Sequence, residues 1–300
     1  MLFPEEAKTE GVNSRALLIW PFFGLAALVS ARAPAALAET EPPSAAPREA
    51  LFPAPRFRFD AGAPLLAPAG VAPDGMLCVG TVDGYVHALD ADGSYRWSRS
   101  VSGAVARRPL FAGEHWYIAT SAERLYALTR EGTLSWIFKP PSPIQSELTA
   151  GPAGTLYFVA ADRCLYAVST RGGVSLRLPF GELKAGPITG PDGAIWAENQ
   201  SGSVIRVHGL DVRRFAPNVA SDVTFADPDS VRDDAGHFWH ARADGVVELR
   251  QSAAASPSLL TLAEAPLLPP VWSRAARYAL VSSRNGLVFA LDSISPRPSP

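Results

Sequence analysis

The sequence is poor in lysine, in cysteine and in motifs of known catalytic chemistry. Its 300 residues include only three lysines, Lys8, Lys139 and Lys184, and its formal net charge is −2. A nucleic-acid surface needs lysine and arginine clustered on one face, so this pattern argues against a nucleic-acid partner. No G-x-S-x-G, H-E-x-x-H, phosphate-loop or paired-cysteine metal motif occurs. The sequence therefore predicts no catalytic, cofactor-binding or metal-binding residue, and it leaves any binding residues unknown.

One short pattern, in contrast, is present six times. The clearest copy runs from Gly80 to Trp97 and reads GTVDGYVHALDADGSYRW. A regular period near 40 residues is typical of propellers and other repeat arrays, in which each unit buries its apolar faces against its neighbours. The copies are 39, 40, 39, 43 and 41 residues apart when they are aligned on Gly84, Glu123, Arg163, Gly202, Gly245 and Gly286.

Each repeat contains several short strands separated by glycine, aspartate and proline turns. In the third repeat, residues 155–160, 165–168 and 174–178 are rich in β-branched and aromatic side chains. The last copy ends after its third strand, and Arg56–Phe59 near the other end of the folded region matches the missing fourth strand. We therefore predict an all-β fold over residues 55–294, a six-bladed β-propeller of four-stranded blades whose N-terminal strand completes the last blade.

The segments outside the repeats indicate export. Arg15 precedes an apolar run over residues 16–29, and the small-residue site Ala36-Leu37-Ala38 follows it. This order predicts a secretory signal peptide over residues 1–38, with an uncleaved anchor as the alternative. Residues 39–54 are expected to form a Pro/Ala-rich linker, and residues 295–300 a disordered tail. The residue directly after the cleavage site is Glu39 and not a cysteine, so we expect a periplasmic or secreted protein without a lipid anchor.

Three features of the repeats admit both a functional and a packing interpretation. Cys78 and Cys164 fall in repeats about two blades apart, so we expect two unpaired core residues rather than a disulfide. An aromatic-rich column at the same place in each repeat could stack on a flat ligand, but filling the wedge between twisted sheets is favoured. The column consists of Cys78, Tyr117, Tyr157, Trp196, Trp239 and Leu280.

The acidic stretch at residues 227–240 is the richest source of potential metal ligands. Histidines three apart on a strand point to opposite faces, and the aspartates lack the spacing of a calcium loop. Residues 233–236 also coincide with the hairpin turn of the other repeats. We therefore favour a solvated loop over a metal site for Asp227, Asp229, Asp233, Asp234, His237 and His240.

The segments ALDADGSYRW (88–97) and ALTREGTLSW (127–136) resemble the repeats of the pyrroloquinoline-quinone-like propellers. The resemblance implies that Trp97 and Trp136 dock against the neighbouring blade, with Leu176 in the equivalent place of the third repeat. It covers residues 55–292, is close in repeats one to three and six, and decays in repeats four and five. One branch of the family consists of eight-bladed, calcium-containing quinone dehydrogenases, and the other of non-catalytic propellers of the bacterial envelope.

The sequence fits the second branch, because it has about six blades, no Cys-Cys pair and no threonine before the motif glycine. We therefore expect an exported, non-catalytic β-propeller without a cofactor that acts as a protein-binding scaffold in the bacterial cell envelope. Its expected partner is another envelope protein, and the mature chain is expected to be a monomer without a membrane span. The alternatives are a quinone-dependent oxidoreductase and a carbohydrate or cell-wall binding module.

Overall fold

A computed structural model describes residues 55–209, 211–216, 229–252, 256–262 and 264–292. The chain divides into two units, residues 1–46 and 47–300, and every described residue belongs to the second. The predicted signal peptide (1–38), linker (39–54) and tail (295–300) lie outside the described residues.

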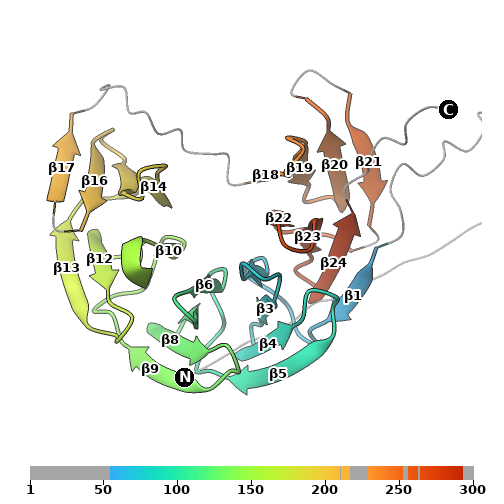
Figure 1. Ribbon diagram of the computed structural model, residues 1–300, viewed down its shortest axis with the longest axis horizontal. Helices are drawn as coiled ribbons and strands as arrows, with labels where there is room; N and C mark the ends of the chain where they lie inside the picture. The colour runs from blue at the N-terminus through green and yellow to red at the C-terminus, as the bar shows by residue number, and fades with distance from the viewer. Residues whose placement is uncertain (1–54, 210, 217–228, 253–255, 263, 293–300) are drawn as a thin grey trace, which may run out of the picture. The chain divides into compact units, whose positions relative to one another are not determined.

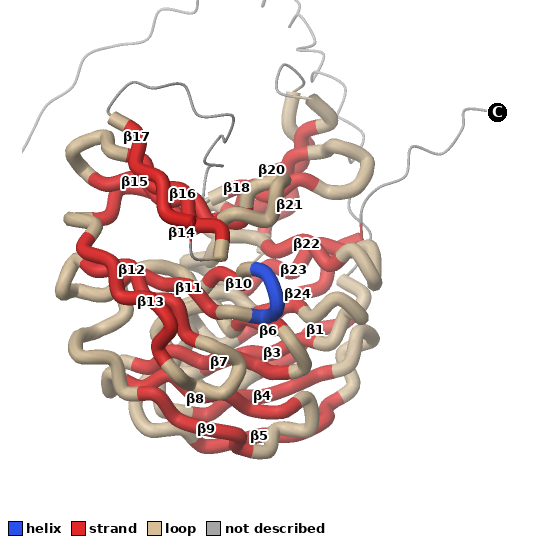
Figure 2. The backbone as a smooth tube through the Cα atoms, turned by 60° about the vertical axis from the view of Figure 1, so that its left-hand side comes forward, coloured by secondary structure: helices blue, strands red, loops and turns tan. Residues whose placement is uncertain are grey.

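The described residues form six antiparallel sheets of four strands each, and each sheet is one blade of a propeller (Figure 1). In Figure 2 the strands dominate the tube, and the segment drawn as helix is the 3-10 turn η1 (Pro152–Gly154). Blade 1 consists of β2 (Gly70–Val71), β3 (Leu77–Gly80), β4 (Tyr85–Leu89) and β5 (Tyr95–Ser100). Blade 2 consists of β6 (Leu110–Ala112), β7 (His115–Thr120), β8 (Arg124–Thr129) and β9 (Leu134–Phe138). Blade 3 consists of β10 (Thr149–Ala150), β11 (Leu156–Val159), β12 (Cys164–Val168) and β13 (Val174–Pro179). Blade 4 consists of β14 (Leu183–Thr189), β15 (Ile195–Asn199), β16 (Val204–His208) and β17 (Asp211–Phe215). Blade 5 consists of β18 (Ser230–Arg232), β19 (Phe238–Ala241), β20 (Val246–Arg250) and β21 (Ser258–Thr261). Blade 6 consists of β22 (Val271–Ser273), β23 (Tyr278–Ser282), β24 (Leu287–Asp292) and, from the N-terminal end, β1 (Phe57–Asp60).

The N-terminal strand completes the last blade, as the sequence predicts. Strand β1 pairs antiparallel with β24, with Phe57 opposite Ala290 and Asp60 opposite Leu287. Arg56 extends this contact, because its backbone N–H donates to the Ala290 carbonyl at 2.9 Å. A sheet edge exposes unpaired backbone groups that can recruit other chains, so β1 protects the edge of β24.

The residue on which the repeats align has the same backbone conformation in all of them. Its φ is positive in each blade: 83° at Gly84, 56° at Glu123, 62° at Arg163, 78° at Gly202, 91° at Gly245 and 101° at Gly286. Positive φ is sterically open to glycine and strained for other residues. In blade 1 the requirement is doubled, since a Cβ on Gly84 would lie 2.5 Å from the Val101 carbonyl oxygen. The glycine column of the sequence is therefore the tight turn between the second and third strands of each blade.

The hydrophobic core lies between the blades rather than within one layer. Five buried clusters each combine residues of two successive blades: 1 with 2, 2 with 3, 3 with 4, 5 with 6, and 6 with 1. Burial of apolar surface is worth about 25 cal/mol per Å², so these clusters supply most of the stabilisation. The sixth cluster contains residues of blade 4 alone: Ala194, Trp196 and Val204, with Ile188 and Phe215 packed against them.

Candidate functional site

The aromatic column predicted from the repeats is packing material. Every member is buried, from fully inaccessible Cys78, Tyr117 and Trp239 to Trp196 at 8% exposure. The interpretation as wedge filling between blades is therefore confirmed for five members of the column, whereas Trp196 is buried within blade 4 alone. Cys78 and Cys164 are both buried free thiols, which confirms that they do not pair.

The docking tryptophans bridge neighbouring blades as the family resemblance implies. The Trp97 indole donates from Nε1 to the Arg130 carbonyl in blade 2 at 2.8 Å, and Trp136 donates to the Thr170 carbonyl in blade 3 at 2.8 Å. Each ring lies over a glycine of the next blade, so that a Cβ on Gly132 would approach the Trp97 ring to 2.6 Å. Both indoles are half-buried rather than fully buried. The β1 residue Phe57 occupies the same place in blade 6 and covers Gly93 of blade 1.

The acidic stretch at 227–240 is not a wholly solvated loop, because the carboxylate of Asp233 is buried and hydrogen-bonded. Asp227 lies outside the described residues. The Asp233 side chain is 1% exposed and accepts hydrogen bonds from the His237 backbone N–H at 2.9 Å, the His237 ring Nδ1 at 2.9 Å and Trp239 Nε1 at 3.2 Å. Burial raises the pKa of this carboxyl, but the hydrogen bonds from His237 and Trp239 outweigh it and hold the pKa below its usual value. The expectation of a solvated loop is therefore wrong at Asp233, because the hairpin turn folds the carboxylate inward.

No group of three or more His, Cys, Asp or Glu side chains that could hold a metal ion is found among the described residues. In the same part of the chain, no helix is long and apolar enough to cross a membrane.

A cavity of ≈ 470 Å³ opens where the first strands of blades 1, 2 and 6 meet. Its ionisable lining groups are Arg108 and Arg274, whose guanidinium groups are hydrogen-bond donors suited to anionic ligands. Trp272 stacks on Trp239 with ring centroids 6.5 Å apart. The cavity is lined by Val71, Ala72, Pro73, Arg108, Pro109, Leu110, Phe111, Val271, Trp272 and Arg274.

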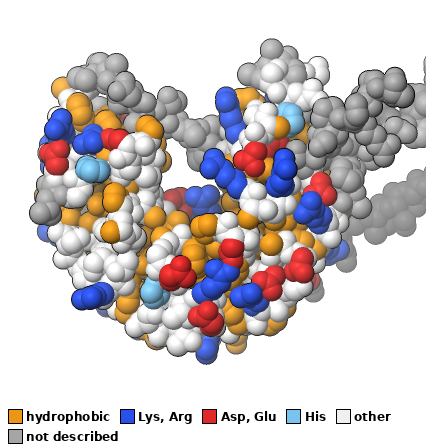
Figure 3. All heavy atoms as spheres, in the orientation of Figure 1, with side chains coloured by type: hydrophobic (Ala, Val, Ile, Leu, Met, Phe, Trp, Pro, Cys, Tyr) orange, Lys and Arg blue, Asp and Glu red, His pale blue; other side chains and the backbone are white. Residues whose placement is uncertain are grey.

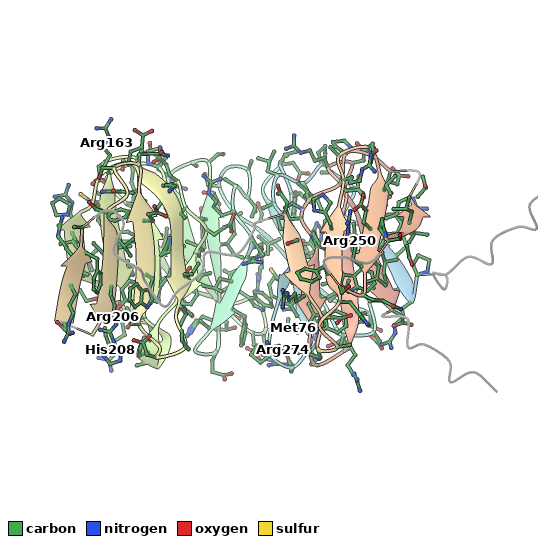
Figure 4. All side chains as sticks on the ribbon, turned by 90° about the horizontal axis from the view of Figure 1, so that it is seen from above. Met76, Arg163, Arg206, His208, Arg250 and Arg274 are labelled. Atoms are coloured by element: carbon green, nitrogen blue, oxygen red, sulfur yellow. The ribbon has the colours of Figure 1, made fainter. Side chains whose placement is uncertain are left out.

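The second candidate surface lies between blades 4 and 5, and we call it the open junction. No hydrophobic cluster of the described residues joins these two blades, and the space-filling view is hollowed between them (Figure 3). Figure 4 shows Arg206 and His208 on blade 4 and Arg250 on blade 5, on the two sides of this junction. Sequence analysis missed Arg206 and Arg250, although both interrupt columns that are otherwise apolar.

Comparison with known proteins finds a similarity over the first three blades. The profile of the family described as outer membrane protein assembly factor BamB matches residues 48–182, which contain blades 1 to 3. Over these residues the chain is similar to the pyrroloquinoline-quinone-like repeats of that family. No curated protein sequence gives a significant match.

Solved structures agree on the propeller fold. The crystal structure of BamB from Moraxella catarrhalis superposes with a TM-score of 0.53 at 18% identity, over 80% of this chain and 87% of that one. The Neurospora crassa Pan2 WD40 domain superposes with a TM-score of 0.55 at 12% identity, over 82% of this chain and 98% of that one. At these identities the likeness shows a shared fold, and a propeller fold serves many functions.

Proposed function

We propose that this propeller is an exported, non-catalytic scaffold that binds another protein in the bacterial cell envelope. The observation that carries the proposal is the open junction, where no buried cluster of the described residues joins two sheet faces of the kind that are sealed elsewhere. Exposed sheet faces with aromatic and arginine side chains are typical of protein-binding surfaces. The description of the matching family as an outer membrane protein assembly factor supports the same class of function.

The proposal includes export and a monomeric mature chain. Residues 1–38 would be the signal peptide and residues 39–54 the linker that separates the propeller from the point of cleavage. The cavity between blades 1, 2 and 6 is consistent with binding rather than catalysis, because its ionisable lining groups are two arginines. Arginine orients anionic groups well and transfers protons poorly at neutral pH.

The test is site-specific photocrosslinking in intact cells, with the crosslinker at the open junction and, separately, on an exposed outer strand. Tyr95 of β5 and Ile137 of β9 are suitable outer positions, since both side chains are exposed. We expect one envelope protein to be crosslinked and identified by mass spectrometry. The purified protein should also show no dye-linked alcohol or sugar oxidation when pyrroloquinoline quinone and calcium are added. Quinone-dependent turnover, or specific retention on cell-wall glycan without any protein crosslink, would contradict the proposal.

A further inference from the structure

Five junctions between blades share one packing rule. Each junction has a buried cluster that contains three equivalent positions. The first blade contributes the residue four positions after its motif turn. The next blade contributes two residues, one seven positions before and one five positions after the motif turn of that blade. All of these residues are apolar, and the first is alanine in four of the five cases. The five sets are Ala88 with Trp116 and Leu128, Ala127 with Leu156 and Val168, Ala167 with Ile195 and Val207, Leu249 with Ala279 and Leu291, and Ala290 with Leu77 and Leu89.

The junction between blades 4 and 5 breaks this rule at two of its three positions. The corresponding residues are Arg206 on blade 4 and Phe238 with Arg250 on blade 5. A guanidinium cannot be buried in an apolar seam without a partner, and two of them facing each other would also repel. The open junction therefore coincides with arginines at the positions that are apolar in every other junction.

Each face of the open junction carries an arginine over an aromatic ring. On blade 4, Arg206 lies 5.9 Å from the Trp196 ring centre, and Trp196 stacks on Phe215 with ring centroids 5.7 Å apart. On blade 5, Arg232 lies 4.0 Å from the Phe238 ring centre. Because Trp196 is paired across β15 and β16 with Arg206, and Phe238 across β19 and β20 with Arg250, both faces present rows of rings and guanidinium groups.

The local carboxylates use only part of the donor capacity of these arginines. Asp192 accepts from Nε of Arg206 at 3.0 Å and from Nη2 at 2.6 Å, and Asp211 lies 3.9 Å from Nη1 of the same guanidinium. Glu248 accepts from Nη2 of Arg250 at 3.1 Å. Each guanidinium has five N–H donors, so several remain for an external acceptor. The Arg250 side chain is 42% exposed and Arg206 20% exposed, which leaves both within reach of a ligand.

We propose that the open junction binds an acidic, extended polypeptide segment of the partner protein. This inference rests on the proposed function and adds the site and the chemistry of the partner. Carboxylates at different positions of the segment would pair with Arg206 on the face of blade 4 and with Arg250 on the face of blade 5. In an extended chain alternate side chains point to opposite sides, so the other residues would contact the half-buried rings of Phe215 and Phe238.

The test measures the binding of a synthetic peptide of alternating glutamate and valine to the purified propeller, by calorimetry and by tryptophan fluorescence. The key variant combines Arg206→Ala with Arg250→Leu, which restores the residue types of the sealed junctions. We expect it to fold and to bind the peptide at least about tenfold more weakly, because two charge-assisted contacts are lost. Arg206→Gln with Arg250→Gln provides a second variant that removes the charges without adding apolar surface. The matched control is Arg163→Gln, an exposed arginine at the opposite end of the blades, and it should bind as the parent does (Figure 4).

Several results would overturn this inference. One is equal binding of a peptide in which lysine replaces glutamate, and another is unchanged binding by both junction variants. Equal binding of phosphatidylglycerol vesicles would assign the surface to lipid instead. If the peptide bound only after residues 217–228 were replaced by glycine and serine, the chain itself would be the occupant. A partner crosslinked from Tyr95 or Ile137 but not from the open junction would overturn the inference alone, whereas no protein crosslink at either place would overturn the proposed function.

Discussion

The indole of Trp97 donates a hydrogen bond to the carbonyl oxygen of Arg130, 2.8 Å away across the junction between blades 1 and 2. Its ring also covers Gly132, whose φ of 79° and missing Cβ make room for it. One side chain thus supplies both a polar and an apolar link between blades.

Truncation of Trp97 should therefore weaken the first junction. We expect Trp97→Ala to lower the free energy of unfolding by about 3 kcal/mol, the lower end for a large aromatic because the indole is only half-buried. Trp97→Phe should recover part of the loss, since the ring contact returns without the hydrogen bond. Urea unfolding followed by circular dichroism measures both effects. An unshifted midpoint for Trp97→Ala would show that the ring does not hold the blades together.

Removal of residues 55–60 should make the protein aggregate. This deletion takes away β1, exposes the edge of β24 and uncovers Gly93, which Phe57 covers. It also removes the ion pair between Arg56 and Asp292. Size-exclusion chromatography should show higher oligomers, while removal of residues 295–300 serves as the control. A monomeric deletion variant with an unchanged melting temperature would refute closure by this strand.

Stability should fall in acid partly through Asp233. Hydrogen bonds to the carboxylate hold its folded pKa below the usual value, so its contribution is complete above the ordinary aspartate pKa and is lost as pH falls through the folded pKa. Asp233→Ala should cost about 2–3 kcal/mol at neutral pH, because His237 and Trp239 lose their acceptor. It should also flatten the acid limb of the stability curve. Asp234→Ala is the matched control, since the Asp234 carboxylate is next in the sequence but its side chain is 41% exposed. An equal effect of both variants would contradict a special role for Asp233.

Neither cysteine should react with thiol reagents while the protein is folded. Burial raises the pKa of the Cys78 thiol well above its ordinary value and also raises that of Cys164, where the nearby Asp162 adds to the effect. The reactive thiolate is therefore scarce and inaccessible at pH 8. Mass spectrometry after iodoacetamide treatment should show no adduct in buffer and two in urea. A stoichiometric adduct on the native protein would place one thiol at the surface.

Much of this architecture follows from the sequence because a propeller repeats a local plan. The period, the strand lengths and the turn at Gly84 are properties of neighbouring residues, so the chain alone predicted six four-stranded blades. The number of strands in each repeat predicted the pairing of β1 with β24, because the last repeat lacks its fourth strand and the N-terminal end has one strand without a repeat of its own. The docking of Trp97 on the next blade required the family resemblance as well.

The candidate binding surfaces were decided by tertiary structure. Arg206 and Arg250 occupy different columns of the repeat, and their meaning appears only once the packing of each column against the next blade is known. The cavity of ≈ 470 Å³ combines residues of blades 1, 2 and 6, which no local sequence pattern connects. Asp233 reads as a turn residue in the sequence, yet the fold of the hairpin buries it. The sequence by itself determined the repeating unit, because strands and turns depend on adjacent residues. Only the tertiary structure decided which faces are sealed and which remain open, because that depends on side chains about 40 residues apart that the ring brings into contact.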